Sequence, residues 1–286
     1  MRKLFIDVTV LAARYLPQRA KQTVYRFPPV ARLIRQQLNR AVPVGLTQVE
    51  IAGGKLAGFY MLLDLRSEKD YWLGTYEPDL QEAITGLVQP GMVAYDLGAN
   101  IGYITLLLAR CVGESGQVVA IEALPDNLER LDNNITLNKL DPIVKIVHGA
   151  VVERSQQVDF YIGPSDGMGK VEGSAGRQDV VYSETIAVQG IALDDFVFQS
   201  GNPVPQFVKI DIEGGEVLAF QGMKRVLNDA RPIVLMELHG PEAAVAAWQA
   251  LTDAGYQICY MKPDFPIVTG PEVLDWKAYL ASFPPR

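Results

Sequence analysis

The sequence contains little cysteine and no long hydrophobic run. Two cysteines among 286 residues, Cys111 and Cys259, are too few for a disulfide framework, which favours a reducing compartment. The longest apolar runs are far shorter than the roughly 20 residues of a membrane-spanning helix. Asp7, Arg14 and Pro17 interrupt the first apolar stretch, so no signal peptide is evident. These absences favour a cytoplasmic protein.

Charge is distributed unevenly along the chain. Residues 1–40 carry nine Lys or Arg and one acid, whereas the remaining residues carry 17 bases and 32 acids. One interpretation is a solubilising helix that docks on the acidic remainder. Another is a basic amphipathic helix in peripheral contact with an anionic membrane, because apolar residues recur there at helical spacing. We expect no nucleic-acid partner, since the acidic remainder repels phosphates.

Proline and glycine positions predict three segments. Residues 1–46 form a basic helical N-terminal segment, with helices over about 3–15 and 30–40 broken by prolines. Residues 47–90 hold a β-hairpin around Gly53-Gly54 and a lead-in helix. Residues 91–286 form the main domain.

In the main domain, short apolar runs alternate with helical patterns, which is typical of an α/β domain. We expect a Rossmann-like fold whose mostly parallel seven-stranded sheet has helices on both faces. The clearest strand signals lie at 93–97, 118–121, 144–147, 207–212, 233–238 and 256–261, and the clearest helical patterns at 101–112 and 125–138. Strand-like pieces at 158–162 and 185–189 flank a Gly-rich stretch, 163–176, which we assign to the acceptor side of a site.

The strand at 93–97 leads through a glycine turn into a helix, an arrangement that presents backbone N–H groups to a ligand. Asn100 and Tyr103 stand where a dinucleotide fingerprint would have its second and third glycines after Gly98, which disfavours a nicotinamide cofactor. Asp96, just before the turn, is an anion that suits a cationic amino-acid or sulfonium ligand. Gly102 ends the turn and allows close approach to the backbone.

Two further features fit a nucleoside ligand. Glu122 ends the second strand, where a carboxylate can accept hydrogen bonds from ribose hydroxyls. The turn after the third strand, which includes Ala150, is expected beside the adenine ring. His148 in the same turn reads more simply as a surface or packed histidine.

Charged residues then alternate along two later strands. Lys209, Asp211 and Glu213 occupy alternate positions, so they share one face, as do Glu237 and His239. Burying unpaired charges is costly, so these groups are expected to pair or to line a site at the carboxyl ends of the strands. The alternative is that they are solvated charges at strand ends.

These motifs together resemble the FkbM-type methyltransferases, a family of the class I, Rossmann-like group that uses S-adenosylmethionine. The resemblance covers about 47–240 and rests on YWLGTYEPDL at 71–80, DLGANIGY at 96–103, Glu122 with Pro125-Asp126-Asn127, KIDIEGGE at 209–216, and Glu237. One departure is that Glu122 is followed by Ala123-Leu124-Pro125, where the family has proline directly after the acid.

The resemblance implies O-methylation of a hydroxyl on a small molecule such as a sugar, a glycolipid or a polyketide-like metabolite. It implies that Asp211 faces the reacting methyl and that Glu122 binds the ribose. The residues implied for the amino-acid end of the cofactor are Asp96, Gly98, Asn100 and Gly102, and those implied to close over it are Tyr76 and Glu77.

Methyl transfer needs an aligned acceptor oxygen and a group that takes its proton. The candidate bases are His239 and Asp211, with Glu237 orienting. We expect no metal here, although these three ligand types would also suit Mg²⁺ or Mn²⁺. Two rival interpretations are a nicotinamide-dependent dehydrogenase on the same fold and a non-catalytic, cofactor-binding or membrane-recruited scaffold.

Overall fold

The computed structural model describes residues 40, 42–163, 169–175, 180–182, 184–274 and 277–284. The N-terminal helices expected at 3–15 and 30–40 therefore lie outside the described residues, except for Arg40. So does part of the Gly-rich stretch, at 164–168 and 176. The expected roles of these segments, including peripheral membrane contact through residues 1–40, stay predictions. None of the helices among the described residues is long and apolar enough to cross a membrane.

The described chain separates into two compact units. The smaller unit comprises the described residues up to Glu82 together with Asn133–Lys139, and the larger unit comprises the rest. The smaller unit contains the predicted hairpin, in which β1 (Leu46–Glu50) pairs antiparallel with β2 (Tyr60–Asp64). The connection between them includes the short helical turn η1 (Gly54–Leu56), and α4 (Lys69–Leu73) follows β2.

The edge of this hairpin is held by amide side chains of the same unit. The N–H of Tyr60 donates to Asn138 Oδ1 at 2.9 Å, and the N–H of Leu62 donates to Asn134 Oδ1 at 2.7 Å. Because buried or edge N–H groups need acceptors, these two amides end the sheet at β2 without a third strand.

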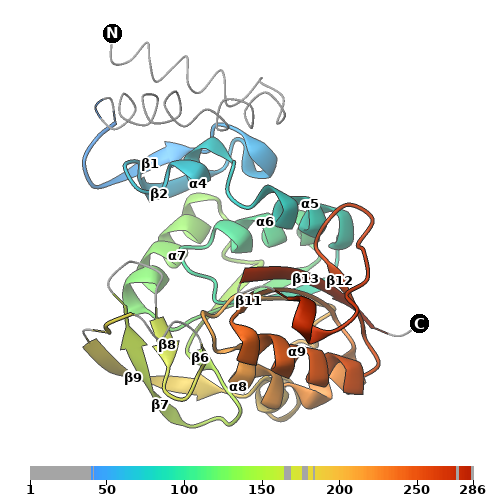
Figure 1. Ribbon diagram of the computed structural model, residues 1–286. Helices are drawn as coiled ribbons and strands as arrows, with labels where there is room; N and C mark the ends of the chain where they lie inside the picture. The colour runs from blue at the N-terminus through green and yellow to red at the C-terminus, as the bar shows by residue number, and fades with distance from the viewer. Residues whose placement is uncertain are drawn as a thin grey trace. The chain divides into compact units, whose positions relative to one another are not determined.

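The larger unit is built on a seven-stranded sheet in the order β12-β13-β11-β10-β3-β4-β5 (Figure 1). Five strands run parallel, as predicted: β3 (Val93–Leu97), β4 (Gln117–Glu122), β5 (Val144–His148), β10 (Phe207–Ile210) and β11 (Ile233–His239). The series does not end at β12 (Gln257–Tyr260), as the sequence indicates. A further strand, β13 (Lys277–Phe283), inserts antiparallel between β12 and β11.

Helices cover both faces of this sheet, as predicted (Figure 1). On one face lie α6 (Tyr103–Val112) and the start of α7 (Pro125–Leu137), preceded in the chain by α5 (Pro78–Leu87). On the other face lie α8 (Glu216–Gln221) and α9 (Pro241–Asp253). Short helical turns complete the unit: η2 (Asp195–Gln199), η3 (Val226–Ala230) and η4 (Pro271–Val273).

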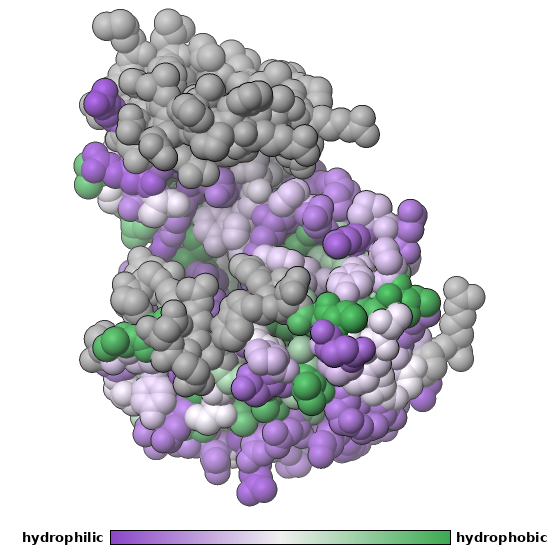
Figure 2. Space-filling view, in the orientation of Figure 1, coloured by the Kyte–Doolittle hydropathy of each residue, from purple (hydrophilic) through white to green (hydrophobic). Residues whose placement is uncertain are grey.

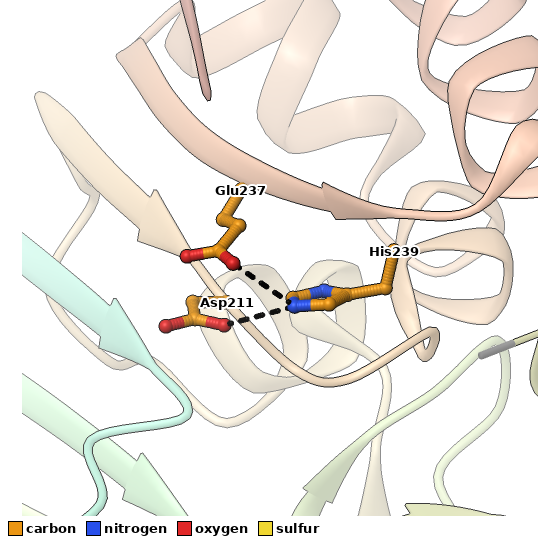
Figure 3. A group of neighbouring side chains, drawn as sticks. All are labelled: Asp211, Glu237 and His239. Carbon is orange, nitrogen blue, oxygen red and sulfur yellow. Dashed lines mark ion pairs between the residues drawn. The ribbon is translucent and has the colours of Figure 1, made fainter. Parts of the chain in front are cut away.

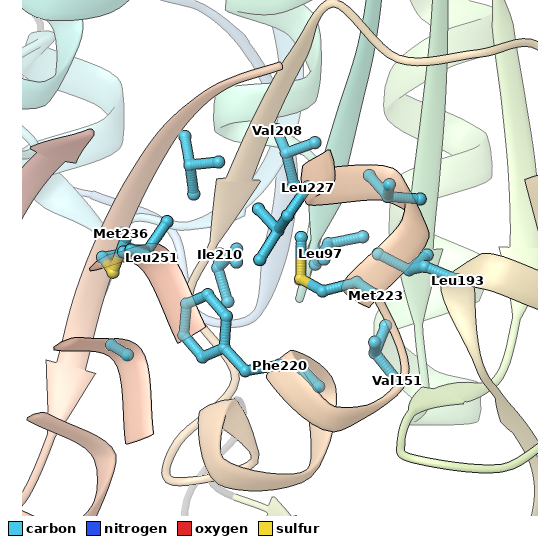
Figure 4. Close-up of a cluster of buried hydrophobic side chains, with 14 of the residues drawn as sticks. Leu97, Val151, Leu193, Val208, Ile210, Phe220, Met223, Leu227, Met236 and Leu251 are labelled. Atoms are coloured by element: carbon cyan, nitrogen blue, oxygen red, sulfur yellow. The ribbon is translucent and has the colours of Figure 1, made fainter. Parts of the chain in front are cut away.

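A large hydrophobic core lies between the sheet and the α8, η3 and α9 side (Figure 4). Alternate residues of the strands, such as Leu97, Ile210 and Met236, meet Phe220 of α8 and Leu227 of η3 there, all nearly inaccessible to solvent. The intervening strand residues face the α6 side, and several of them are charged. The apolar side chains of the strands pack against α8, η3 and α9, and the charged side chains of the same strands therefore lie on the α6 side.

A separate four-stranded sheet, β6-β9-β7-β8, follows β5 in the chain. It contains both strand-like pieces predicted from the sequence, as β7 (Gln157–Ile162) and β9 (Glu184–Ile191), together with β6 (Ala150–Val151) and β8 (Gly169–Val171). On the face of the larger unit seen in Figure 2, hydrophilic residues predominate and hydrophobic ones form small groups.

Candidate active site

The turn after β3 owes its two glycines to close packing of the protein. Gly98 has φ +75°, and a Cβ there would lie 1.9 Å from the carbonyl oxygen of Asp211. Gly102 has φ +92°, and a Cβ there would lie 2.6 Å from a methyl carbon of Leu131 in α7. Asn100 between them also has a positive φ, of 50°. Left-handed backbone tolerates glycine best and asparagine better than most residues.

Asp96 is the most deeply buried acid of the turn region. Its carboxylate has no exposed surface, and Oδ1 lies 3.1 Å from Lys209 Nζ, directly across from it in the register of β3 and β10. Thr105 Oγ1, on α6, donates to Asp96 Oδ2 at 2.6 Å. Lys209 Nζ also donates to the Gly98 carbonyl at 2.8 Å. Asp96 thus holds the turn through protein contacts, and its assignment to the cofactor stays a prediction.

Glu122 occupies the end of β4, beside the same turn. Its Oε2 accepts from the N–H of Asn100 at 2.8 Å, and its Oε1 accepts from the N–H of Leu124 at 2.9 Å and from Asn127 Nδ2 at 3.4 Å. A carboxylate offers about four acceptor sites, so acceptor capacity remains for a ligand hydroxyl. The acid expected to bind ribose therefore also fixes the glycine turn.

Ala150 follows β5 and lies close to the end of β4. The intervening Gly149 donates its N–H to the Glu122 carbonyl at 2.9 Å, and the ring Nε2 of His148 lies 3.1 Å from the Ala123 carbonyl. Ala150 itself is buried. The two positions expected to face adenosine are thus neighbours in the fold.

Asp211, Glu237 and His239 come together at the carboxyl ends of β10 and β11 (Figure 3). The strand β10 ends at Ile210, earlier than expected, and the N–H of Asp211 makes the last hydrogen bond of its parallel ladder with β3, to the Leu97 carbonyl at 3.1 Å. His239 Nε2 lies 3.3 Å from Glu237 Oε1 and 3.8 Å from Asp211 Oδ1. The expected pairing of the charges of these strands is confirmed, and their role in a functional site stays a prediction.

Two further acids complete this cluster. Glu216, in the first turn of α8, has no exposed surface, and its Oε1 lies 2.9 Å from His239 Nδ1. Glu213 Oε2 lies 3.9 Å from His239 Nε2. The Glu213 side chain is partly exposed, and the backbone φ of this residue is +52°. One imidazole therefore contacts four carboxylates.

Protonation in the cluster is strongly perturbed. Burial lowers the pKa of His239, but hydrogen bonds to Glu216 and Glu237 outweigh this and raise that pKa to about 10. Burial raises the pKa of Asp211 to about 6, against the opposing effect of Lys209. At neutral pH the imidazole is therefore protonated and the Asp211 carboxylate is mostly ionised.

The remaining predicted residues, Tyr76 and Glu77, belong to the smaller unit. The ring of Tyr76 lies 4.4 Å, centroid to centroid, from that of Tyr71, and its carbonyl accepts a hydrogen bond from the Gln81 side chain. Their closure over the cofactor stays a prediction.

Sequence reasoning missed two residues that hold the site. Thr105 lies one helical turn beyond the glycine turn among apolar residues, and Glu216 was visible only as the last letter of KIDIEGGE. For both, the informative signal is a polar residue at an otherwise buried helix position, since such groups need partners.

Comparison with known proteins identifies the family. The model of the methyltransferase FkbM domain matches residues 96–258, more than half of the chain. Hexuronic acid methyltransferase AglP of Haloferax volcanii is 25% identical over 180 residues, which cover 63% of this chain and 66% of that protein. The tRNA (adenine(58)-N(1))-methyltransferase TrmI of Thermus thermophilus is 40% identical over only 62 residues, 21% of this chain and 24% of that protein.

Among solved structures, methyltransferase FkbM from Methylobacillus flagellatus is similar with a TM-score of 0.45 at 19% identity, covering 75% of this chain and 52% of that chain. This chain thus spans slightly less than two thirds of the Haloferax protein and about half of the Methylobacillus protein. The extent of the family match shows that the chain belongs to the FkbM methyltransferase family, with its Rossmann-like α/β fold.

Proposed function

We propose that this protein is an S-adenosylmethionine-dependent O-methyltransferase that acts on a hydroxyl of a small molecule. The proposal rests on one observation in this chain of the FkbM family: the candidate ligand-binding groups lie together at one edge of the sheet. The glycine turn, Glu122 and the cluster around His239 all lie at the carboxyl ends of the neighbouring strands β4, β3, β10 and β11. This edge is where an open α/β sheet places its ligands.

The residues present fit the proposed cofactor. The N-cap residue of helix α6 is Gly102, which offers no side-chain hydrogen bond, and such a helix N-terminus suits a carboxylate such as that of an amino acid. Glu122 retains acceptor capacity for ribose hydroxyls. The surplus of acids around Asp211 suits a ligand that carries a sulfonium and an ammonium group.

When bound, S-adenosylmethionine supplies a methyl group already activated by a sulfonium. The protein must then align an acceptor oxygen, which can contribute roughly 7–11 kcal/mol, and accept its proton. Asp211 is the better base of the two candidates, because it is ionised above about pH 6 and its side chain is 22% exposed. His239 is already protonated in this environment, so it would stabilise the ionised Asp211.

With the cofactor bound, Asp211 would accept the proton of the acceptor hydroxyl as the methyl group passes from sulfur, which would keep the bonding electron pair, to the acceptor oxygen. Glu237, 3.3 Å from His239 Nε2, keeps the ring in place beside the base.

A sugar is the acceptor class that we favour. The hexuronic acid methyltransferase of Haloferax volcanii supports it, since that protein is named for a sugar acid. The tRNA methyltransferase match covers only 21% of this chain, and it gives no reason to revise the prediction of no nucleic-acid partner.

The test is transfer of a deuterated methyl group, followed by mass spectrometry of the acceptor. The full chain is incubated with labelled S-adenosylmethionine and, separately, with neutral sugars, uronic acids and a hydroxylated polyketide. We expect a mass gain on a sugar hydroxyl. Cofactor binding without transfer to any of these acceptors would favour the scaffold interpretation instead.

A further inference from the structure

The cluster at the ends of β10 and β11 has the composition of a metal site. One oxygen each from Asp211 and Glu237 and one ring nitrogen of His239 all lie within 4.8 Å of one another (Figure 3). Ligand atoms around Mg²⁺ or Mn²⁺ lie about 2.0–2.2 Å from the ion, so small side-chain adjustments would bring all three into contact with one cation. Two carboxylates and an imidazole are a donor set that such ions accept.

The histidine is oriented as a metal ligand would be. Its Nδ1 lies 2.9 Å from Glu216 Oε1, which accepts the Nδ1 proton, and its Nε2 is directed toward the Asp211 and Glu237 carboxylates. Metal-bound histidines characteristically donate their other ring N–H to a carboxylate, which fixes the ring and raises its basicity. Glu216 is itself fully buried, and its Oε2 has no hydrogen-bond partner, so its charge is available to the ring.

The balance of charge around His239 also favours a bound cation. Four carboxylates, those of Asp211, Glu213, Glu216 and Glu237, lie within 3.9 Å of a single imidazole. Lys209, which also pairs with Asp211, lies closer to Asp96 than to Asp211, at 3.1 Å against 3.8 Å. A surplus of buried negative charge is costly, and a divalent ion would offset it where one imidazolium cannot.

We propose that Asp211, Glu237 and His239 Nε2 bind one divalent cation of the Mg²⁺ or Mn²⁺ type, with Glu216 as the residue that positions the histidine. A metal-bound ring nitrogen carries no proton, so binding of the cation at Nε2 would release any proton held there. Asp211 and Glu213 are the more exposed members of the cluster, so the cation keeps an open side toward solvent.

The open side has a chemical use that rests on the proposed methyltransferase function. A divalent ion there would bind an acceptor hydroxyl and lower the pKa of that hydroxyl, and Asp211 would then act as a metal ligand in place of the base role proposed above. The ion would also let an acidic sugar approach an otherwise repulsive group of carboxylates. The metal site itself does not depend on that function.

Mn²⁺ is the probe for the test, because its electron paramagnetic resonance reports both binding and a nitrogen ligand. The chain has only two histidines, so His148, which is exposed, provides the matched control. The tag-free full chain is titrated with Mn²⁺, and coupling to imidazole nitrogen is measured in the parent and in His148→Gln, His239→Gln, Glu216→Gln and Asp211→Asn.

We expect one Mn²⁺ per chain with nitrogen coupling in the parent and in His148→Gln, and loss of the coupling in His239→Gln. Glu216→Gln should keep the coupling but bind about 10- to 100-fold more weakly. If circular dichroism shows that His239→Gln is unfolded, Asp211→Asn decides, with weaker binding and retained coupling expected. No Mn²⁺ binding at millimolar concentration, or coupling that persists in folded His239→Gln, would overturn the proposal.

Calorimetry with S-adenosylmethionine on the same samples separates this proposal from the proposed function. Cofactor binding without Mn²⁺ binding would remove the metal site and leave the methyltransferase proposal intact. Mn²⁺ binding with the expected coupling, but no cofactor binding, would support the metal site and remove the methyltransferase proposal.

Discussion

Lys209 and Asp96 form a buried ion pair across neighbouring strands, with Nζ 3.1 Å from Oδ1 and side-chain exposures of 5% and 0%. The same ammonium group donates to the Gly98 carbonyl at 2.8 Å. The pair thus joins β10 to the glycine turn that follows β3. It connects two motifs of the family resemblance, DLGANIGY and KIDIEGGE, through one buried contact.

Removing the lysine should therefore destabilise the fold as well as the site. Lys209→Met leaves the Asp96 carboxylate buried without its cation, which typically costs about 3–5 kcal/mol. Urea unfolding measures the loss, with the exposed Lys224→Met as the matched control. The double variant Lys209→Met with Asp96→Asn should recover part of the stability, and a double variant no more stable than Lys209→Met would contradict the pairing.

Glu122 should affect the adenosine half of the cofactor specifically. Glu122→Gln replaces one acceptor oxygen by a donor, so ribose hydroxyls lose a partner at about 1–3 kcal/mol, roughly 10- to 100-fold in affinity. Calorimetry with S-adenosylmethionine and with adenosine measures both ligands. Asp126→Asn, an exposed acid four residues further along the chain, is the control. Equal affinity of the Gln variant and the parent for adenosine would remove Glu122 from the ribose site.

Gly98 should tolerate no side chain. Gly98→Ala forces a residue with φ +75° into a place where its Cβ meets the Asp211 carbonyl oxygen. The backbone conformation alone costs about 1–3 kcal/mol, and the displaced carbonyl belongs to the candidate base. The midpoint temperature of thermal unfolding and the affinity for S-adenosylmethionine should both fall. Gly86→Ala, with nothing within 4 Å of its Cβ, should instead stabilise α5 by about 0.5–1 kcal/mol.

The strands and helices that have a clear local sequence pattern could be predicted from the sequence. Runs such as 93–97 end in a glycine turn and a helix, and this local pattern correctly predicts β3, α6 and the parallel direction of the neighbouring strands. Strand β13 could not be placed, because its position between β12 and β11 depends on antiparallel pairing over long range rather than on its own pattern. Its residues also follow a stretch without regular strand signals.

The charged residues of the site could be predicted from the sequence, but the residue with which each of them pairs could not. Alternation indicated that Asp211 and Glu237 share an edge with His239, and they do. That Asp96 pairs with Lys209 depends on β3 and β10 being neighbours in the sheet and on their register, and that Glu216 lies beside Nδ1 of His239 depends on how α8 packs on the sheet. Such pairings arise from tertiary packing, which no single stretch of sequence encodes.

Direct binding of S-adenosylmethionine tests the central claim most sharply. The full chain is titrated by isothermal calorimetry with S-adenosylmethionine and, in a parallel experiment, with NAD. We predict saturable binding of one S-adenosylmethionine per chain and no heat of binding from NAD. Saturable binding of NAD, with none of S-adenosylmethionine, would contradict the account.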